Sequence, residues 1–97
     1  MRVIAHRTIV NYYKQYPETK TALENWYKTT KQTVWQNFGE LKKTFNNVDS
    51  AGNQRYVFNI KGNDYRLVAR ILFIQRVVFI RFIGTHKEYD KIDCSAI

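Results

Sequence analysis

The sequence has a single cysteine, a single proline and no long apolar run, and two of these shortages exclude whole classes of protein. Cys94 has no second cysteine to pair with, so no internal disulfide can form, which fits a reducing cytosol. No apolar segment approaches the ~18 residues of a membrane span, and residues 1–10 lack the apolar stretch of a signal peptide. We therefore expect a cytoplasmic protein with no membrane partner.

Motifs for metals and cofactors are also missing. His6 and His86 are the only histidines, and together with Cys94 they make no metal-ligand spacing. No glycine-rich phosphate loop, dinucleotide-binding motif or Ser-His-Asp pattern occurs. We therefore expect no metal and no cofactor, so any catalysis would use ordinary side chains and the substrate's own groups.

Acidic residues are scarce relative to basic ones. Sixteen Lys and Arg stand against eight Asp and Glu, which gives a formal net charge of +8. Such a charge on so small a chain favours phosphate-bearing partners, although an acidic protein partner or a generic basic surface remains open. Residues 1–49 and 50–97 each carry eight basic and four acidic side chains, so there is no basic tail. Any positive patch must be assembled by the fold.

The length and composition predict one folded domain over residues 1–97. The chain is 44% apolar and 15% aromatic, which is typical of a folded chain. No internal repeat, low-complexity segment or linker divides it. We therefore treat all the elements below as parts of one structure.

The first half of the sequence has helical spacing. After a short strand over residues 1–6, apolar residues at i, i+3, i+4 and i+7 predict a helix from Thr8, as its cap, to about Tyr16. Pro17 suits the first turn of a second helix that ends near Gln32. Helical spacing from Val34 to Phe45 suggests a further helical stretch, and residues 46–54 have the composition of a loop.

From Arg55 the apolar period changes to two, which predicts three strands. Gly62-Asn63 and Gln75-Arg76 are the expected hairpin turns. Thr85 can cap a short final helix over residues 86–92. The predicted order is β-α-α-β-β-β-α, an α+β fold with a small, mostly antiparallel four-stranded sheet and helices packed on one face.

The turn positions predict how the strands pair. If Gly62-Asn63 form the first turn, Arg55 lies opposite Arg70, and Asn59 lies opposite Arg66. If Gln75-Arg76 form the second turn, Arg70 also lies opposite Arg81. The expected result is a row of arginines on the face away from the core: Arg55, Arg70 and Arg81, with Arg66 beside them.

Such a row predicts an anion site. Like charges placed opposite each other destabilise a sheet unless something negative lies across them, and phosphate suits the forked donors of guanidinium. Two alternatives remain open: the arginines extend into water, or they form ion pairs with the terminal acids, Glu88, Asp90 and Asp93.

The segment after the last strand carries groups for acid–base chemistry. His86 can give or take a proton, Lys87 can stabilise a developing charge, and Tyr89 can stack on a base or donate a hydrogen bond. Each residue also has a purely structural alternative. His86 would be a helix-start residue, Lys87 a solvated side chain and Tyr89 a core aromatic. If the protein cuts RNA, the substrate's 2′-hydroxyl would be the nucleophile, arginines would hold the phosphate, and a side chain would protonate the leaving oxygen.

Three blocks of the sequence resemble the HigB toxin family of type II toxin–antitoxin modules: Trp35–Phe45, Val57–Val68 and Ile80–Ile92. The resemblance implies a RelE-like fold and a metal-independent mRNA endoribonuclease, or mRNA interferase, that cuts translated mRNA on the ribosome. It also implies a helix-turn-helix antitoxin of the HigA kind that neutralises the toxin. Operator DNA would be bound only through that antitoxin.

The resemblance also implies site residues. Arg66, Arg81, His86 and Tyr89 lie in the matching blocks and are the expected catalytic residues. Arg55, Arg70 and Lys87 are the expected contacts to RNA phosphate. A non-catalytic RNA- or ribosome-binding module of the same fold is the alternative. A DNA-binding repressor is disfavoured, because the turn at Tyr16-Pro17 is too tight for a helix-turn-helix.

Overall fold

The computed structural model describes residues 1–97 and shows an α+β fold, as predicted. No helix in it combines the length and apolar character that a membrane span requires. In chain order the elements are β1 (Arg2–Ile4), α1 (His6–Gln15), the 3-10 helix η1 (Pro17–Thr19), α2 (Lys20–Gln32), α3 (Phe38–Thr44), β2 (Asp49–Gly52), β3 (Arg55–Ile60), β4 (Tyr65–Leu72), β5 (Val77–Thr85) and α4 (His86–Tyr89).

The sheet has five strands rather than the predicted four. Its order is β1-β5-β4-β3-β2, with β1 parallel to β5 and the other neighbours antiparallel. The additional strand, β2, lies in the segment that the composition assigned to a loop. Its residues, Asp-Ser-Ala-Gly, are poor strand formers, so its extended form depends on pairing with β3.

Several helix boundaries also differ from the prediction. Pro17–Thr19, expected as the first turn of the second helix, forms the separate 3-10 helix η1, and α4 ends at Tyr89 rather than at Ile92. Helix α1 begins at His6 after Ala5, so Thr8 is not its cap. Helix α3 begins only at Phe38, because the Asn37 side chain accepts a hydrogen bond from the Glu40 amide at 3.0 Å and fixes the start there. Val34 consequently lies outside the helix and is exposed.

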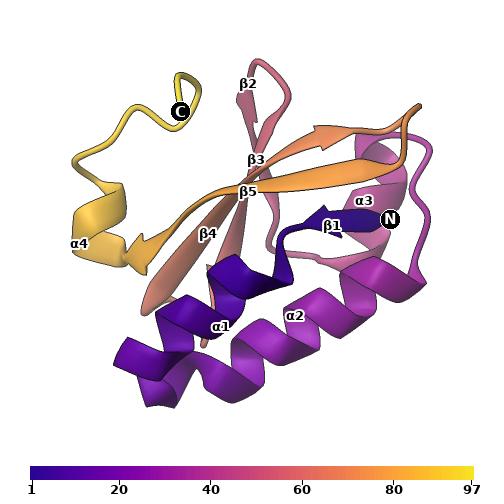
Figure 1. Cartoon of the computed structure of the whole chain (residues 1–97). Helices are drawn as coiled ribbons and strands as arrows, with labels where there is room; N and C mark the ends of the chain where they lie inside the picture. The colour runs from indigo at the N-terminus through magenta and orange to yellow at the C-terminus, as the bar shows by residue number, and fades with distance from the viewer.

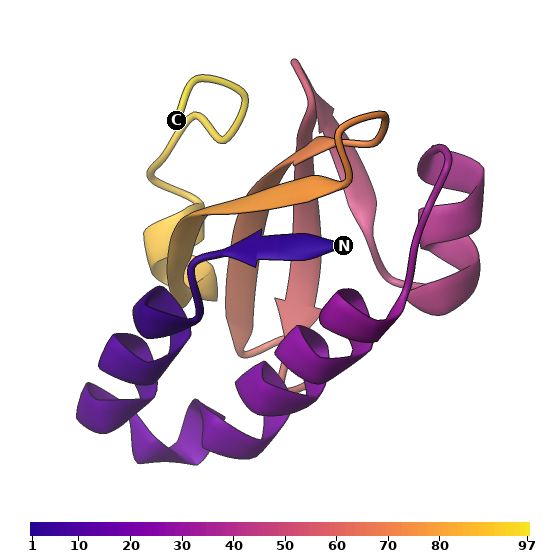
Figure 2. The same ribbon diagram turned by 45° about the vertical axis from the view of Figure 1, so that its right-hand side comes forward.

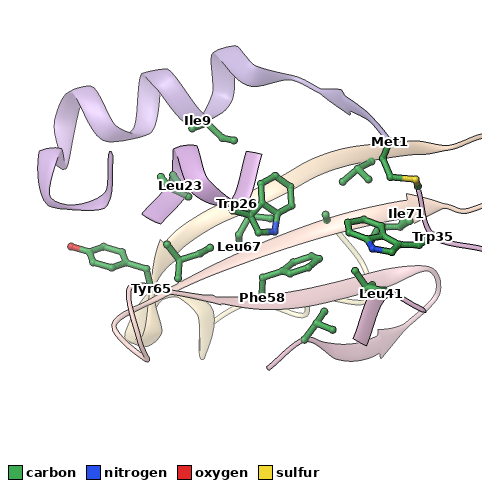
Figure 3. Packing of buried hydrophobic residues seen from close by; sticks show 14 residues of the cluster. Met1, Ile9, Leu23, Trp26, Trp35, Leu41, Phe58, Tyr65, Leu67 and Ile71 are labelled. Atoms are coloured by element: carbon green, nitrogen blue, oxygen red, sulfur yellow. The ribbon is translucent and has the colours of Figure 1, made fainter. Parts of the chain in front are cut away.

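The core lies between the helices and one face of the sheet (Figures 1 and 3). Trp26 of α2 and Phe45, which follows α3, both meet the ring of Phe58 edge-on, with centroid separations of 5.3 and 5.2 Å. The odd-numbered residues of β4 complete this layer: Tyr65, Leu67, Ala69 and Ile71. The even-numbered residues of β4, including Arg66 and Arg70, therefore face the other way.

The register between β3 and β4 matches the prediction. Arg55 is opposite Arg70, and Asn59 is opposite Arg66. The Gly62-Asn63 turn and the burial of one apolar face specify the same pairing, so the sequence was sufficient here. Three of the four arginines, Arg55, Arg66 and Arg70, thus share the face away from the core.

The register between β4 and β5 does not match. The connection is the four-residue turn Phe73–Arg76, and Arg70 is opposite Phe79 rather than Arg81. Val68 pairs with Phe82 and Ala69 pairs with Ile80, so Arg81 is the extra residue of a β-bulge. The predicted pair of Arg70 and Arg81 is therefore wrong, and the continuous row of three arginines does not form.

The second face of the sheet is also covered in part. Val57 and Val68 are paired across β3 and β4 and are buried, although they lie outside the core cluster. Helix α4 and the residues after it lie on the side of the sheet away from α2 and α3 (Figure 2), and the Asn53 side chain donates a hydrogen bond to the carbonyl of Ser95 at 3.0 Å. The expectation that all helices pack on one face holds for α1, α2 and α3 only.

Candidate active site

Arg66, His86 and Tyr89 come together where β4 begins and β5 ends; we call these three residues the α4 site. The guanidinium of Arg66 lies 6.0 Å from the centre of the Tyr89 ring, a cation–π arrangement. The amide of His86 donates a hydrogen bond to the carbonyl of Asp64 at 3.1 Å. This bond fixes the start of α4 beside the β3–β4 turn, next to the strand that carries Arg66.

The position of α4 depends on a capping box. The Thr85 hydroxyl accepts from the Glu88 amide at 3.2 Å, and the Glu88 carboxylate accepts from the Thr85 amide at 2.8 Å. Gly84, which pairs with Arg66, leaves room for this packing, because a methyl group there would lie 2.5 Å from the Phe82 ring. These local contacts set the direction in which the side chains of α4 project.

Arg66 is positioned by its own turn. One of its terminal nitrogens, Nη1, donates to the carbonyls of Asn63 and Tyr65 at 3.0 and 3.1 Å. Its Nε and Nη2 have no hydrogen-bond partner within the protein. The guanidinium is therefore held in place while two of its nitrogens are free to donate to a phosphate.

Tyr89 keeps its proton at neutral pH. Its hydroxyl oxygen lies 3.6 Å from the sulfur of Cys94, and this hydrogen bond, together with burial, raises the pKa of Tyr89 to about 12, although Arg66 acts in the opposite direction. A tyrosine in this state can donate a proton but is a poor base.

His86 and Lys87 are both exposed on α4. The Nδ1 atom of His86 lies 3.6 Å from a carboxylate oxygen of Asp90, an ion pair that exists only when the imidazole is protonated. Lys87 forms no hydrogen bond or ion pair within the protein. Both side chains are accessible to solvent.

Arg55 and Arg70 lie away from the α4 site. Arg66 and Arg70 are four positions apart on β4, about 13 Å along the strand. The Nε of Arg70 donates to the Gln54 side chain at 3.1 Å. Arg55 is more fully occupied, because its Nε and Nη2 both donate to the carbonyl of Ile97, the first at 2.7 Å, and its Nη1 donates to the carbonyl of Asn53 at 2.9 Å. In this arrangement all three nitrogens of Arg55 donate within the protein, and Arg55 secures the C-terminal segment.

Arg81 is exposed and has no partner within the protein. The bulge places it level with Val68 and Ala69, midway along β4 between Arg66 and Arg70. None of the arginines pairs with a terminal acid, since the two ion pairs of the chain both involve a histidine. The alternative of permanent neutralisation by Glu88, Asp90 or Asp93 is therefore not observed.

Two residues that support the α4 site were not found from the sequence. Gly84 precedes the capping box directly, and a glycine at the end of an apolar strand could have marked a close approach. Cys94 gave no signal, because its contact with Tyr89 depends on the path of the chain after α4 ends. No three His, Cys, Asp or Glu side chains are grouped so that they could hold a metal ion.

Comparison with known proteins agrees with this fold. Residues 19–92 match the HigB toxin family, described as the RelE-like toxic component of a toxin–antitoxin system. The chain belongs to the HigB family. As a member of that family it is a toxin of a toxin–antitoxin system, and the predicted RelE-like fold is confirmed.

Curated relatives of the HigB family cover nearly the whole chain. The protein called mRNA interferase HigB of Escherichia coli O6:H1 (strain CFT073) is 31% identical over 94 residues, which are 95% of this chain and 91% of that protein. The mRNA interferase toxin HigB of Escherichia coli K12 is 33% identical over 92 residues, 93% of this chain and 88% of that protein. An mRNA interferase HigB of Shigella flexneri matches to the same extent.

Proposed function

We propose that this HigB-family toxin is an mRNA interferase that cuts RNA at the α4 site without a metal ion. The observation that carries the proposal is the convergence of Arg66 and Tyr89, 6.0 Å apart, beside the exposed start of α4. A cation with free donors, a protonated phenol and an accessible imidazole together provide what phosphodiester cleavage by the 2′-hydroxyl requires.

In the proposed reaction the 2′-oxygen of the RNA attacks the adjacent phosphorus. A bond forms between the 2′-oxygen and phosphorus, and the bond between phosphorus and the 5′-oxygen breaks. The 2′-hydroxyl gives up its proton and the 5′-oxygen receives one, so the products are a 2′,3′-cyclic phosphate and a 5′-hydroxyl. The protein needs to hold the phosphate, stabilise its additional negative charge and transfer these protons.

The side chains of the α4 site divide these tasks. Arg66 offers two free nitrogens to the phosphate. Arg81 is an exposed cation at the bulge of β5, and its side chain can bind the same phosphate. Tyr89, whose raised pKa keeps it protonated, is suited to protonate the leaving oxygen or to stack on a base. His86 is suited to accept the 2′-proton, and Lys87 and Arg70 provide further positive charge. We assign Arg55 a structural role unless RNA displaces the Ile97 carbonyl.

The finer partner assignments also belong to this proposal. The proposed substrate is mRNA under translation on the ribosome, in the cytoplasm. The proposed inhibitor is a helix-turn-helix antitoxin of the HigA kind, through which alone the toxin would reach operator DNA. The family membership and the net charge of +8 support these assignments.

Expression without an antitoxin tests the activity. Arg66→Ala and Arg81→Ala should relieve growth arrest and reduce RNA cleavage by about 10²–10³-fold, the usual effect of removing a charge-stabilising donor. Arg76→Ala, which removes an exposed arginine from the β4–β5 turn, is the matched control and should arrest growth like the parent. Tyr89→Phe should reduce cleavage by about 10²-fold or more, whereas Tyr16→Phe should not.

The products test the mechanism. Cleavage should persist in excess chelator and should leave 2′,3′-cyclic phosphate ends. Loss of cutting in chelator would contradict the metal-free reaction. If folded parent protein bound RNA without cutting it, the chain would be the non-catalytic binding module instead.

A further inference from the structure

A pocket of about 240 Å³ lies between β3 and the segment that joins α3 to β2. Two kinds of side chain line it: the apolar Phe45, Val48 and Phe58, and the amides Asn46, Asn47 and Asn59. We call it the asparagine pocket. Sites for drug-sized ligands measure about 300–1,000 Å³, so this pocket has room for one small ring system.

Three hydrogen bonds hold the segment of residues 44–48 in place. The Trp35 indole nitrogen donates to the Thr44 hydroxyl at 2.9 Å, and the Lys42 ammonium donates to the carbonyl of Val48 at 3.1 Å. The Val48 amide donates to the carbonyl of Phe45 at 3.2 Å. The protein itself therefore sets the shape of the pocket, which lowers the cost of ordering it around a ligand.

The three asparagine side chains of the pocket make no hydrogen bond within the protein. Among the asparagines of the chain, only the side chains of Asn37 and Asn53 do so. Asn46 and Asn47 are exposed and Asn59 is partly exposed. Each amide offers an oxygen that accepts and a nitrogen that donates. A ligand that carries donors and acceptors side by side would satisfy them.

The edge of β3 adds backbone groups to the pocket. The pairing of β2 with β3 begins at Asp49 opposite Val57, so Phe58, Asn59 and Ile60 have no strand partner on that side. Successive residues of an antiparallel strand direct their N–H and C=O groups to alternate sides. At least one of these three residues therefore directs both groups away from β4, toward the side where the pocket lies.

These features together match a nucleobase. A base is a flat ring with apolar faces and with donors and acceptors along its edge, and proteins read it with amide side chains and aromatic surfaces. No charged side chain lines the pocket, whereas phosphates and carboxylates are bound most strongly by charged donors. The pocket is therefore suited to the base of a nucleotide rather than to its phosphate.

The pocket adjoins the α4 site across one pair of strands. Asn59 on β3 lies directly opposite Arg66 on β4, so both residues belong to the same face of the sheet. Side chains opposite each other in an antiparallel pair have Cβ atoms about 4.5–5.5 Å apart. An RNA phosphate held by the free nitrogens of Arg66 therefore brings a neighbouring base close to Asn59.

We propose that the asparagine pocket binds one nucleobase beside the phosphate held at Arg66 and thereby sets a base preference for the cut. This assignment rests on the proposed cleavage of RNA and goes further, because it names the part of the substrate that determines sequence preference. Asn47 contributes from the segment before β2, and Asn59 contributes from β3. Only bases whose edges match the positions of these amides would satisfy them.

The test uses a double variant, Asn47→Ala with Asn59→Ala, which removes an amide from each side of the pocket. The matched control is Gln32→Ala with Gln75→Ala, which removes two side-chain amides at exposed positions outside the pocket. Circular dichroism verifies that both variants fold. Asn47→Ser with Asn59→Ser removes the same amides and replaces the alanine pair if that pair does not fold.

Binding is first measured without cleavage, by NMR titration with the four nucleoside 5′-monophosphates and with ribose 5-phosphate, which has no base. The parent and the control should bind at least one nucleotide about tenfold or more tightly than ribose 5-phosphate, as expected for an amide contact to a base. That nucleotide should also shift the side-chain amide signals of Asn46, Asn47 and Asn59 in the parent. The pocket variant should bind the nucleotide and ribose 5-phosphate equally.

Cleavage is then measured on RNA of mixed sequence, with the cut sites mapped from the product ends. The parent should prefer certain bases at one position next to the cut, and the pocket variant should reduce that preference about tenfold while the control retains it. If ribose 5-phosphate bound the parent as tightly as every nucleotide, or if the pocket variant kept the parent's base preference, the proposal would be overturned. A parent that cuts no RNA would contradict the proposed function, whereas the nucleotide titration would still decide whether the pocket binds a base.

Discussion

Among single residues, Gly84 has the clearest steric requirement. Its Cα lies against the Phe82 ring and near the Glu88 carboxylate, and an added Cβ would approach them to 2.5 and 3.1 Å. Glu88 forms the capping box that begins α4, and Phe82 lies near the end of β5. The glycine therefore allows the close approach on which the α4 site depends.

We expect Gly84→Ala to destabilise the protein by about 1–3 kcal/mol, because the methyl group overpacks this corner. RNA cleavage per folded molecule should also fall, since Phe82 or α4 must move. Urea unfolding and single-turnover cleavage are the measurements. Gly39→Ala is the control: its Cβ would meet only the Asn37 side chain, at 3.2 Å, and alanine favours the helix, so stability should change little. Equal losses in the two variants would contradict the steric argument.

Among the elements, α4 is the one with least stability of its own. It has four residues, far fewer than an isolated helix needs, so its position rests on the Thr85–Glu88 capping box and the bond from the His86 amide to Asp64. It nevertheless carries two of the three residues of the α4 site. The geometry of that site is therefore sensitive to one cap.

Thr85→Ala removes the cap oxygen and should cost about 1 kcal/mol of stability. Cleavage should fall more than stability alone explains, because His86 and Tyr89 lose their fixed positions. Thr85→Ser retains the oxygen and should behave like the parent, whereas Thr21→Ala on an exposed face of α2 should affect neither property. Thermal unfolding and cleavage rates are compared across the set; full activity in Thr85→Ala would contradict a positioning role for the cap.

At the scale of the whole molecule, one side-chain bond joins the helical layer to the sheet. The Tyr65 hydroxyl at the start of β4 donates to the Glu18 carboxylate of η1 at 2.7 Å. This bond lowers the pKa of Glu18 below its ordinary value of 4.5. Because the folded-state pKa is lowered, the pair stabilises the fold fully above about pH 4.5, and the stabilisation is lost as pH falls through the lowered pKa.

Tyr65→Phe should therefore be less stable than the parent at pH 7, and the difference should shrink as pH falls below about 4.5. Urea unfolding at a series of pH values from about 7 to 3 measures it. Tyr16→Phe, at an exposed ring, provides the control and should follow the parent at every pH. A difference between Tyr65→Phe and the parent that stays constant with pH would contradict the linkage to Glu18.

The sequence by itself determined the fold class, the β3–β4 register and the family. Local rules suffice for these features: helical spacing in the first half, period-two alternation after Arg55, and a turn at Gly62-Asn63 that fixes which residues face each other. The positions of Arg66 on the second face and of α4 directly after β5 followed from the same rules.

Only the tertiary structure decided the β4–β5 register, the fifth strand and the hydrogen bonds of the Arg55 guanidinium. A bulge at Arg81 and a four-residue turn set this register, and no short sequence pattern encodes them. Strand β2 forms because it pairs with the edge of β3. Arg55 donates hydrogen bonds to the backbone oxygen of Ile97, which lies 42 residues further along the chain. These features depend on contacts between distant segments, which alternation and turn preference do not describe.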